Sequence, residues 1–212
     1  MNNRSKKTTG LVQMSLFTAI IIIMAMVPGL GYIPLGVIRA TIIHVPVIIG
    51  ALVLGPKKGA ILGGIFGLTS LINNTFAPTV TSFVFSPFYT MGEIHGGVKS
   101  LIICFVPRIL IGIVAYYVYK LVRKVMKNSK HSMVTALAIS GVIGSLTNTL
   151  LVMNLIYLFF GESYAAVKEI AYEALYGTIL VVIGTNGIPE AIVSAILVTA
   201  IGRVFLKSRI RN

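Results

Sequence analysis

The chain contains 212 residues, of which 56% are hydrophobic and only 11% are charged, and its mean hydropathy is +0.94. So few charged residues cannot cover the surface of a water-soluble protein, and the composition therefore excludes a soluble fold. The formal net charge of +13 does not indicate a nucleic-acid-binding protein, because the basic residues flank apolar stretches, as membrane insertion requires.

Six stretches can be drawn that approach the roughly 20 apolar residues needed to cross a bilayer. The predicted spans are residues 11–27, 38–54, 58–72, 98–121, 133–160 and 178–206. The first follows a basic start without a small-residue cleavage pattern, so we interpret it as a retained helix and not as a signal peptide. The sequence thus predicts an all-α, multi-pass protein of the cell membrane, a compact bundle of about six transmembrane helices forming a single domain over residues 1–212.

The distribution of Lys and Arg predicts the orientation of this bundle. Most of the 18 basic residues fall at the two termini, after the second span or between the fourth and fifth spans. Cytoplasmic segments collect Lys and Arg, so both termini are predicted to be cytoplasmic. The basic residues that depart from this pattern are Arg39, Lys99, Arg108 and Lys168, and each falls in an outer loop or within a span.

The second span contains two ionisable residues, Arg39 and His44, and ends at Gly55-Pro56. Five residues separate Arg39 from His44, which places them about 140° apart on a regular helix. They would converge only if the helix began late or bent near Pro46. For His44 a packing and hydrogen-bonding role is the alternative to a binding role.

Two outer segments are expected beside this span. Residues 28–36 form a turn rich in glycine and proline, and residues 73–97 form a longer segment that mixes polar residues with phenylalanine and tyrosine. The longer segment is predicted to be a lid over an outward-facing cavity. The alternative is a loop that lies at the lipid interface with its aromatic rings among the headgroups.

The third span carries small residues at intervals of three and four, which predicts a smooth ridge for close helix packing and a polar tip at its end. The ridge consists of Gly59, Gly63, Gly67, Ser70 and Asn74.

Charged residues inside spans are costly unless they are paired or line a cavity, so Arg39, Arg108 and Glu190 are candidate site residues. An arginine at this depth suits a substrate carboxylate, because its guanidinium forms two parallel hydrogen bonds with that group. The alternative is a structural ion pair between Arg108 and Glu190 that joins two helices.

Polar residues also follow one stripe in each of the last two spans. In the fifth span the stripe is formed by Ser140, Gly144, Thr147, Leu151 and Asn154, with Ser145 and Asn148 beside it. In the sixth span it is formed by Asn186, Glu190 and Ser194, near Gly184, Gly187 and Pro189, which predict a broken helix. These polar groups would bind a polar solute or hydrogen-bond between helices.

Motifs for catalysis and for cofactor binding are absent from the sequence. The one cysteine, Cys104, excludes an intrachain disulfide, and neither His95 nor His131 has partners at metal-ligand spacing. No glycine-rich phosphate loop is present, so ATP would have to be used by another chain. We therefore predict that the protein is not an enzyme and binds neither a metal nor a cofactor.

The order of these features resembles the substrate-binding S components of energy-coupling factor (ECF) vitamin transporters, which are small proteins of about six helices. The resemblance covers essentially the whole chain and rests on the first helix with Ser15 and Ala19, on GYIPLGVIRATIIHVPVIIGALVLGPKKGAILGGIFGLTSLI, and on SFVFSPF and CFVPRILIG. It implies high-affinity capture of a water-soluble vitamin, energised by a transmembrane coupling subunit and two ATPase subunits. The pantothenate-type members are the most similar, with hydroxymethylpyrimidine, pyridoxine or folate as alternative ligands.

In this family an alanine-xxx-alanine motif on the first helix contacts the coupling subunit, which implies that Ser15 and Ala19 lie at that interface, with serine replacing the first alanine. The substrate-binding residues expected from the sequence are Arg39, His44, Asn74, Arg108, Asn148, Asn154, Asn186 and Glu190. A stand-alone secondary transporter that is coupled to protons through Glu190 and His44 is the alternative from another functional class.

Overall fold

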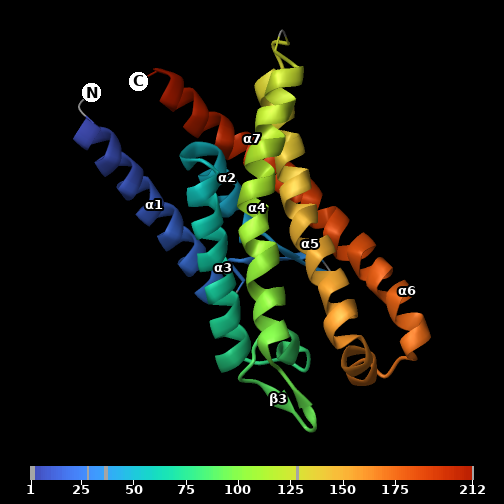
Figure 1. Cartoon of the computed structure of the whole chain (residues 1–212). Coiled ribbons are helices and arrows are strands. Elements are labelled where there is room, and N and C mark those ends of the chain that lie inside the picture. Colours follow the sequence, from blue (N-terminus) through green and yellow to red (C-terminus); the bar gives the residue numbers. More distant parts are fainter. Residues whose placement is uncertain (1–2, 28, 36–37, 128, 212) are drawn as a thin grey trace.

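The apolar stretches of the sequence form the helices of a membrane-sized bundle (Figure 1). The computed structural model describes residues 3–27, 29–35, 38–127 and 129–211, and the side chains of residues 8–27, 29–31, 41–127 and 129–207. The α-helices are α1 (Asn3–Met26), α2 (His44–Leu54), α3 (Pro56–Phe76), α4 (Val98–Val125), α5 (Ser132–Val167), α6 (Tyr172–Val182) and α7 (Ile188–Arg211). The shorter elements are the antiparallel pairs β1 (Tyr32–Leu35) with β2 (Ile38–Thr41) and β3 (Thr90–Met91) with β4 (Ile94–His95), the 3₁₀-helix η1 (Ser82–Val84) and the π-helical turn η2 (Ile183–Gly187).

The described chain passes along the bundle six times, because α6, η2 and α7 form one continuous rod. The start of α1, the end of α7 and the α2–α3 and α4–α5 turns lie at one end of the molecule, which we call the basic end (Figure 1). The opposite end is covered by residues 77–97, which include η1, β3 and β4 and which we call the cap. This arrangement confirms the predicted helical membrane bundle.

Four helical segments of the described chain are long and apolar enough to span a membrane, namely Thr8–Met26, Val98–Val125, Ser132–Val167 and Tyr172–Lys207. Helix α3 has 21 residues, but its glycines and asparagines reduce its hydropathy. Helix α2 has only 11 residues, about 16 Å of helix, which is half of the hydrocarbon thickness.

The prediction of one helix over residues 38–54 was wrong. Residues 38–41 form strand β2, in which Arg39 is paired with Pro34 of β1, and the helix begins only at His44. The prediction failed because an apolar run flanked by glycine and proline is compatible with either a buried strand or a helix. The hairpin and the short helix together make the second pass.

The two longest predicted spans contain irregular turns of different kinds. Helix α5 changes direction at Phe160, whose backbone is not helical (φ −135°, ψ 21°). The predicted break near Gly184 and Gly187 was wrong, because the chain continues through that region as a π-helical turn. A π-helical turn inserts an extra residue without ending the helix.

Helices α3 and α4 approach each other along the predicted glycine ridge. A Cβ atom added to Gly63 would lie 2.1 Å from the backbone oxygen of Arg108, and one added to Gly112 would lie 2.6 Å from the backbone of Gly59. Contacts this close are possible only where both backbones lack an intervening side chain. Gly55 ends α2 with φ 97°, and Pro56 then begins α3 at a position where its missing N–H is not needed.

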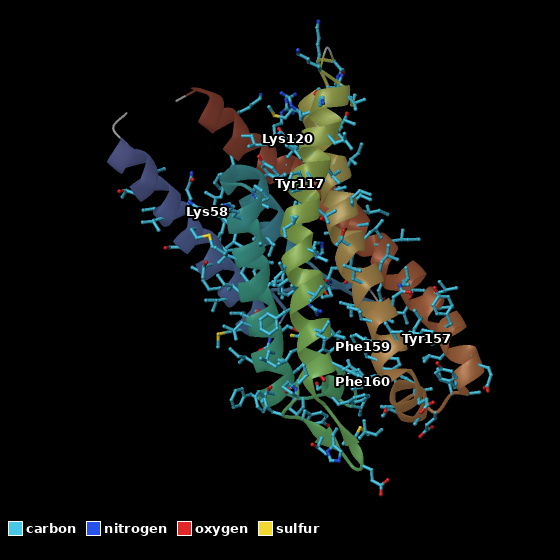
Figure 2. The ribbon with its side chains drawn as sticks, in the orientation of Figure 1. Lys58, Tyr117, Lys120, Tyr157, Phe159 and Phe160 are labelled. Carbon is cyan, nitrogen blue, oxygen red and sulfur yellow. The ribbon has the colours of Figure 1, made fainter. Side chains whose placement is uncertain are left out.

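Two apolar clusters divide the interior by depth. The first, nearer the basic end, contains residues such as Ile48, Ile111, Leu137 and Val198. The second joins the cap to α4, α5 and α6 and contains residues such as Phe83, Ile103, Val152 and Ile179. Phe83 is fully buried, so the cap is packed onto the bundle and is part of its core. Figure 2 shows Tyr157, Phe159 and Phe160 at this same end of α5.

Candidate functional site

A layer of polar side chains lies between the two apolar clusters. On α4, Arg108 falls between Ile103 of one cluster and Ile111 of the other. The same alternation places polar residues between Leu137 and Val152 on α5, and between Ile179 of α6 and Val198 of α7. We define the polar layer as His44, Arg108, Ser145, Asn148, Thr149 and Glu190.

Glu190 connects α7 to the hairpin and to α5. Its side chain is 7% exposed. One carboxylate oxygen accepts a hydrogen bond from the backbone N–H of Thr41 (2.8 Å), and the other accepts one from the hydroxyl of Thr149 (3.1 Å). A buried carboxylate needs such donors, because burial without them is costly. Glu190 therefore fixes the end of strand β2 against the bundle.

His44 and Asn148 lie at the same depth in the bundle. Ile48 of α2 contacts Gly144 of α5, because a Cβ atom added to Gly144 would lie 2.7 Å from the Ile48 side chain. His44 and Asn148 each lie one turn, about 6 Å, from this contact, and both lie toward the cap. Neither ring nitrogen of His44 nor the Oδ1 of Asn148 has a hydrogen-bond partner among the described residues.

Arg108 lies directly beneath the cap. Its side chain is 7% exposed, and one terminal N–H group donates to the backbone oxygen of Ile103 (2.7 Å). The guanidinium carbon lies 5.7 Å from the ring centroid of Phe66 and 5.2 Å from that of Phe85, a cap residue. Aromatic faces at these distances stabilise the cation without neutralising its charge. An Arg108–Glu190 ion pair stays an alternative to ligand binding by these two residues.

The remaining predicted binding residues lie elsewhere. Asn74 of α3 donates to the backbone oxygen of Ser70 and accepts from the hydroxyl of Ser82, both at 2.8 Å, so it attaches the cap to α3. Asn154 is exposed and donates to Leu150 of its own helix. Asn186 is half-buried in η2. The backbone of Arg39 lies in β2, but its side chain is outside the described residues.

The structure does not bring Asn154 together with the polar layer, because of the face on which it lies in α5, and its binding role stays a prediction. Ser140 and Gly144 are buried, but they lie at one edge of the buried face, whose centre is nearer Ser145 and Val152. Steps of three and four residues along the helix from Ser140 and Gly144 therefore lead to its exposed side, where Asn154 lies. Residues of the site that the sequence did not single out are Thr41, Phe66, Phe85 and Thr149. Thr149 follows Asn148 directly and lies four residues beyond Ser145, and that spacing was the available signal.

The predicted interface residues, Ser15 and Ala19, are both exposed on α1. Only 17% of the apolar window of α1 is buried, the lowest share of the four spanning segments. One face of this helix is therefore free to contact lipid or another protein.

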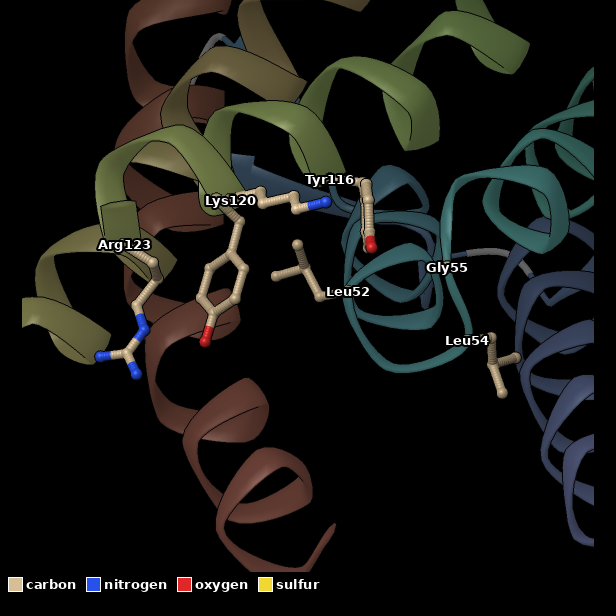
Figure 3. A pocket seen from close by; sticks show the side chains of 7 residues that line it. Leu52, Leu54, Gly55, Tyr116, Lys120 and Arg123 are labelled. Atoms are coloured by element: carbon tan, nitrogen blue, oxygen red, sulfur yellow. The ribbon is translucent and has the colours of Figure 1, made fainter. Parts of the chain in front are cut away.

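A cavity of about 480 Å³ opens at the basic end, between the end of α2 and α4 (Figure 3). None of the predicted binding residues lines it, and it lies on the opposite side of the first apolar cluster from the polar layer. It is therefore separate from the candidate site.

The described residues contain no group of three His, Cys, Asp or Glu side chains that could hold a metal ion. The absence of a bound metal or cofactor stays a prediction. The chemistry that the polar layer does offer is recognition: one cation, one carboxylate, and neutral donors and acceptors on four helices.

Residues 10–202 match the family model described as the ECF transporter, substrate-specific component. The chain belongs to this family. It is therefore a membrane-embedded substrate-specific component, and its fold and location agree with the expectation from the sequence.

Relatives of this substrate-specific component include two named transporters. The chain is 40% identical over 173 residues to a pantothenic acid transporter of Lactococcus lactis subsp. cremoris, which covers 81% of this chain and 80% of that protein. It is 32% identical over 208 residues to a pantothenate transporter of Leuconostoc mesenteroides subsp. mesenteroides, which covers 95% and 94%. The crystal structure of an S component for biotin from an ECF-type transporter is 20% identical, covers 96% of this chain and 95% of its own, and superposes with a TM-score of 0.49.

Proposed function

We propose that the chain is the high-affinity binding subunit for pantothenate and that it presents this vitamin for uptake. Two relatives that each align with about 80% or more of the chain are named for this substrate. The observation that carries the proposal is the buried cation of Arg108 beneath the cap, where it would meet the carboxylate of an entering ligand.

The rest of the polar layer fits the other groups of pantothenate. The vitamin carries an amide and two hydroxyls, which need both donors and acceptors. The ring nitrogens of His44 and the amide oxygen of Asn148 have no hydrogen-bond partner among the described residues. The buried hydroxyl of Ser145 has none there either. Buried polar groups are normally satisfied, so these three are suited to a polar ligand.

The function is tested by purifying the protein in detergent and identifying co-purified small molecules by mass spectrometry. We expect pantothenate at close to one molecule per chain. Recovery of hydroxymethylpyrimidine, pyridoxine or folate in its place would contradict the proposal. It would also fail if no ligand were retained and if liposomes without ATPase subunits took up substrate in response to a proton gradient, as a stand-alone secondary transporter would.

We also propose that transport requires partners, a coupling subunit and two ATPase subunits, and that ATP is used by those chains. The chain itself would catalyse no reaction and need no cofactor. In this proposal the basic end faces the cytoplasm, as do both termini, because Lys and Arg gather on that side of membrane proteins. The exposed face of α1 that contains Ser15 and Ala19 would contact the coupling subunit.

Substitution Ala19→Trp tests that interface. The bulky ring on this exposed face should reduce recovery of the coupling subunit in a co-purification by at least roughly tenfold, since a closely packed helix interface does not admit a large side chain. Pantothenate binding by the isolated chain should be unchanged. The control is Ile196→Trp on α7, where the side chain is 61% exposed and a ring should be tolerated. Normal assembly of the Ala19 variant would show that the partner contacts another face.

A further inference from the structure

The cavity at the basic end combines apolar, aromatic and cationic walls. Helix α2 and the glycine after it supply the first wall, and the last three turns of α4 supply the others (Figure 3). The lining residues are Leu52, Leu54 and Gly55 from α2 and the turn after it, and Tyr116, Tyr119, Lys120 and Arg123 from α4. Figure 3 shows the Lys120 amine and the Tyr116 ring extending from α4 above Leu52.

No side-chain carboxylate of the described residues lies near the cations of this cavity. The five acidic residues of the whole chain are Glu93, Glu162, Glu169, Glu173 and Glu190. The first lies in the cap, the next three lie around the α5–α6 turn beside it, and Glu190 lies in the polar layer. Among the described residues, no side-chain carboxylate therefore lies at the basic end to balance its positive charge.

One of the two cations is held in place by a neighbouring helix. A terminal N–H group of Arg123 donates to the hydroxyl of Ser132, the first residue of α5, at 2.9 Å. Ser132 is 1% exposed, so this bond fixes the guanidinium at the rim of the cavity. Lys120 lies one turn nearer the bilayer centre on the same helix.

The depth of the cavity indicates what kind of anion it would meet. Lys120 and Arg123 lie near the end of the α4 spanning segment, where basic residues begin to replace apolar ones, and basic residues at such a position meet the lipid phosphates at the membrane–water boundary. Leu52 and Leu54 provide apolar surface beside the cations, and the tyrosine hydroxyls provide hydrogen-bonding groups. A soluble phosphate would use the cations and the tyrosine hydroxyls, whereas a phospholipid would also use the apolar wall.

We propose that this cavity binds the headgroup of an anionic phospholipid, with the lipid phosphate at Lys120 and Arg123 and the start of an acyl chain along Leu52 and Leu54. This site is separate from the vitamin site and does not depend on the proposed substrate.

The proposal is tested by native mass spectrometry of the purified chain titrated with phosphatidylglycerol or with phosphatidylcholine of the same acyl chains. We expect phosphatidylglycerol to be retained preferentially, and the double substitution Lys120→Gln/Arg123→Gln to reduce its retention by roughly tenfold. Lys124→Gln/Lys127→Gln is the matched control, since it removes the same charge from the same end outside the cavity lining. It should change retention by less than about twofold.

Two further measurements separate the alternatives. Lys120→Gln alone alters an exposed residue, so it covers the case in which the double variant does not fold, and it should still weaken retention severalfold. Inorganic phosphate at millimolar concentration should not displace the lipid. Equal retention of the two lipids, equal losses in the cavity and control variants, or displacement by inorganic phosphate would overturn the proposal.

Discussion

Replacing Arg108 with alanine is expected to weaken pantothenate binding by at least tenfold, measured by isothermal titration calorimetry on the purified protein. A hydrogen bond to a charged group contributes about 1.5–3 kcal/mol, and the lower bound already corresponds to more than a tenfold change in Kd. The buried position of Arg108 under the cap strengthens the effect, because water screens the charge less there. An unchanged affinity would leave Arg108 with a structural role only.

A ligand that lacks the carboxylate provides the control for this substitution. Pantothenol carries an alcohol where pantothenate has its carboxylate, and the two molecules are otherwise alike. It should bind the unsubstituted protein more weakly than pantothenate does, and Arg108→Ala should change its affinity by less than about threefold. If both ligands lost affinity equally, the variant would have disturbed the site generally, for example by releasing the bond from Arg108 to Ile103.

Neighbouring glycines of α3 should respond in opposite ways to the same change. Gly63→Ala places a methyl group 2.1 Å from the backbone oxygen of Arg108, so α3 and α4 must separate, and we expect a loss of at least about 1–3 kcal/mol of stability. Gly64→Ala adds a methyl group where no atom lies within 4 Å, and alanine is the better helix former by up to about 1 kcal/mol.

Thermal unfolding in detergent, followed by loss of the monodisperse size-exclusion peak, measures the two variants side by side. The Gly63 variant should unfold at a clearly lower temperature, and the Gly64 variant at the same temperature or a higher one. Equal transition temperatures would mean that the α3–α4 contact is looser than the structure describes. Because Gly63 packs against the backbone of Arg108, the Gly63 variant should also weaken vitamin binding.

Features that depend on local chemistry could be predicted from the sequence. Gly55 and Pro56 ended one helix and began the next as expected, and the ridge of Gly59, Gly63 and Gly67 packs against α4. The burial of Arg108 and Glu190 followed from the cost of placing charge in a membrane. These outcomes required no knowledge of which helices are neighbours.

Features that depend on which other segment of the chain packs against a given segment could not be predicted. Strand β2 exists because β1 and Glu190 satisfy its backbone, and neither contact is visible in the apolar run itself. The outward position of Asn154 depends on which part of α5 faces α4 and α7, and the stripe through Ser140 lay at the margin of that face. The π-helical turn at Ile183–Gly187 likewise replaced a break that glycine and proline suggested.

The division of the second pass into a hairpin and a short helix has a consequence for how the site can vary. A residue inserted into a continuous helix rotates everything beyond it by about 100° and disrupts its packing. A pair of residues added to the β1–β2 hairpin would lengthen the strands and keep the same faces, because strands alternate with a period of two. Helix α2, which begins anew at His44 and is buried along almost its whole length, would keep its register. A change in hairpin length would therefore reshape one wall of the proposed binding site while the packing of α2 stays constant.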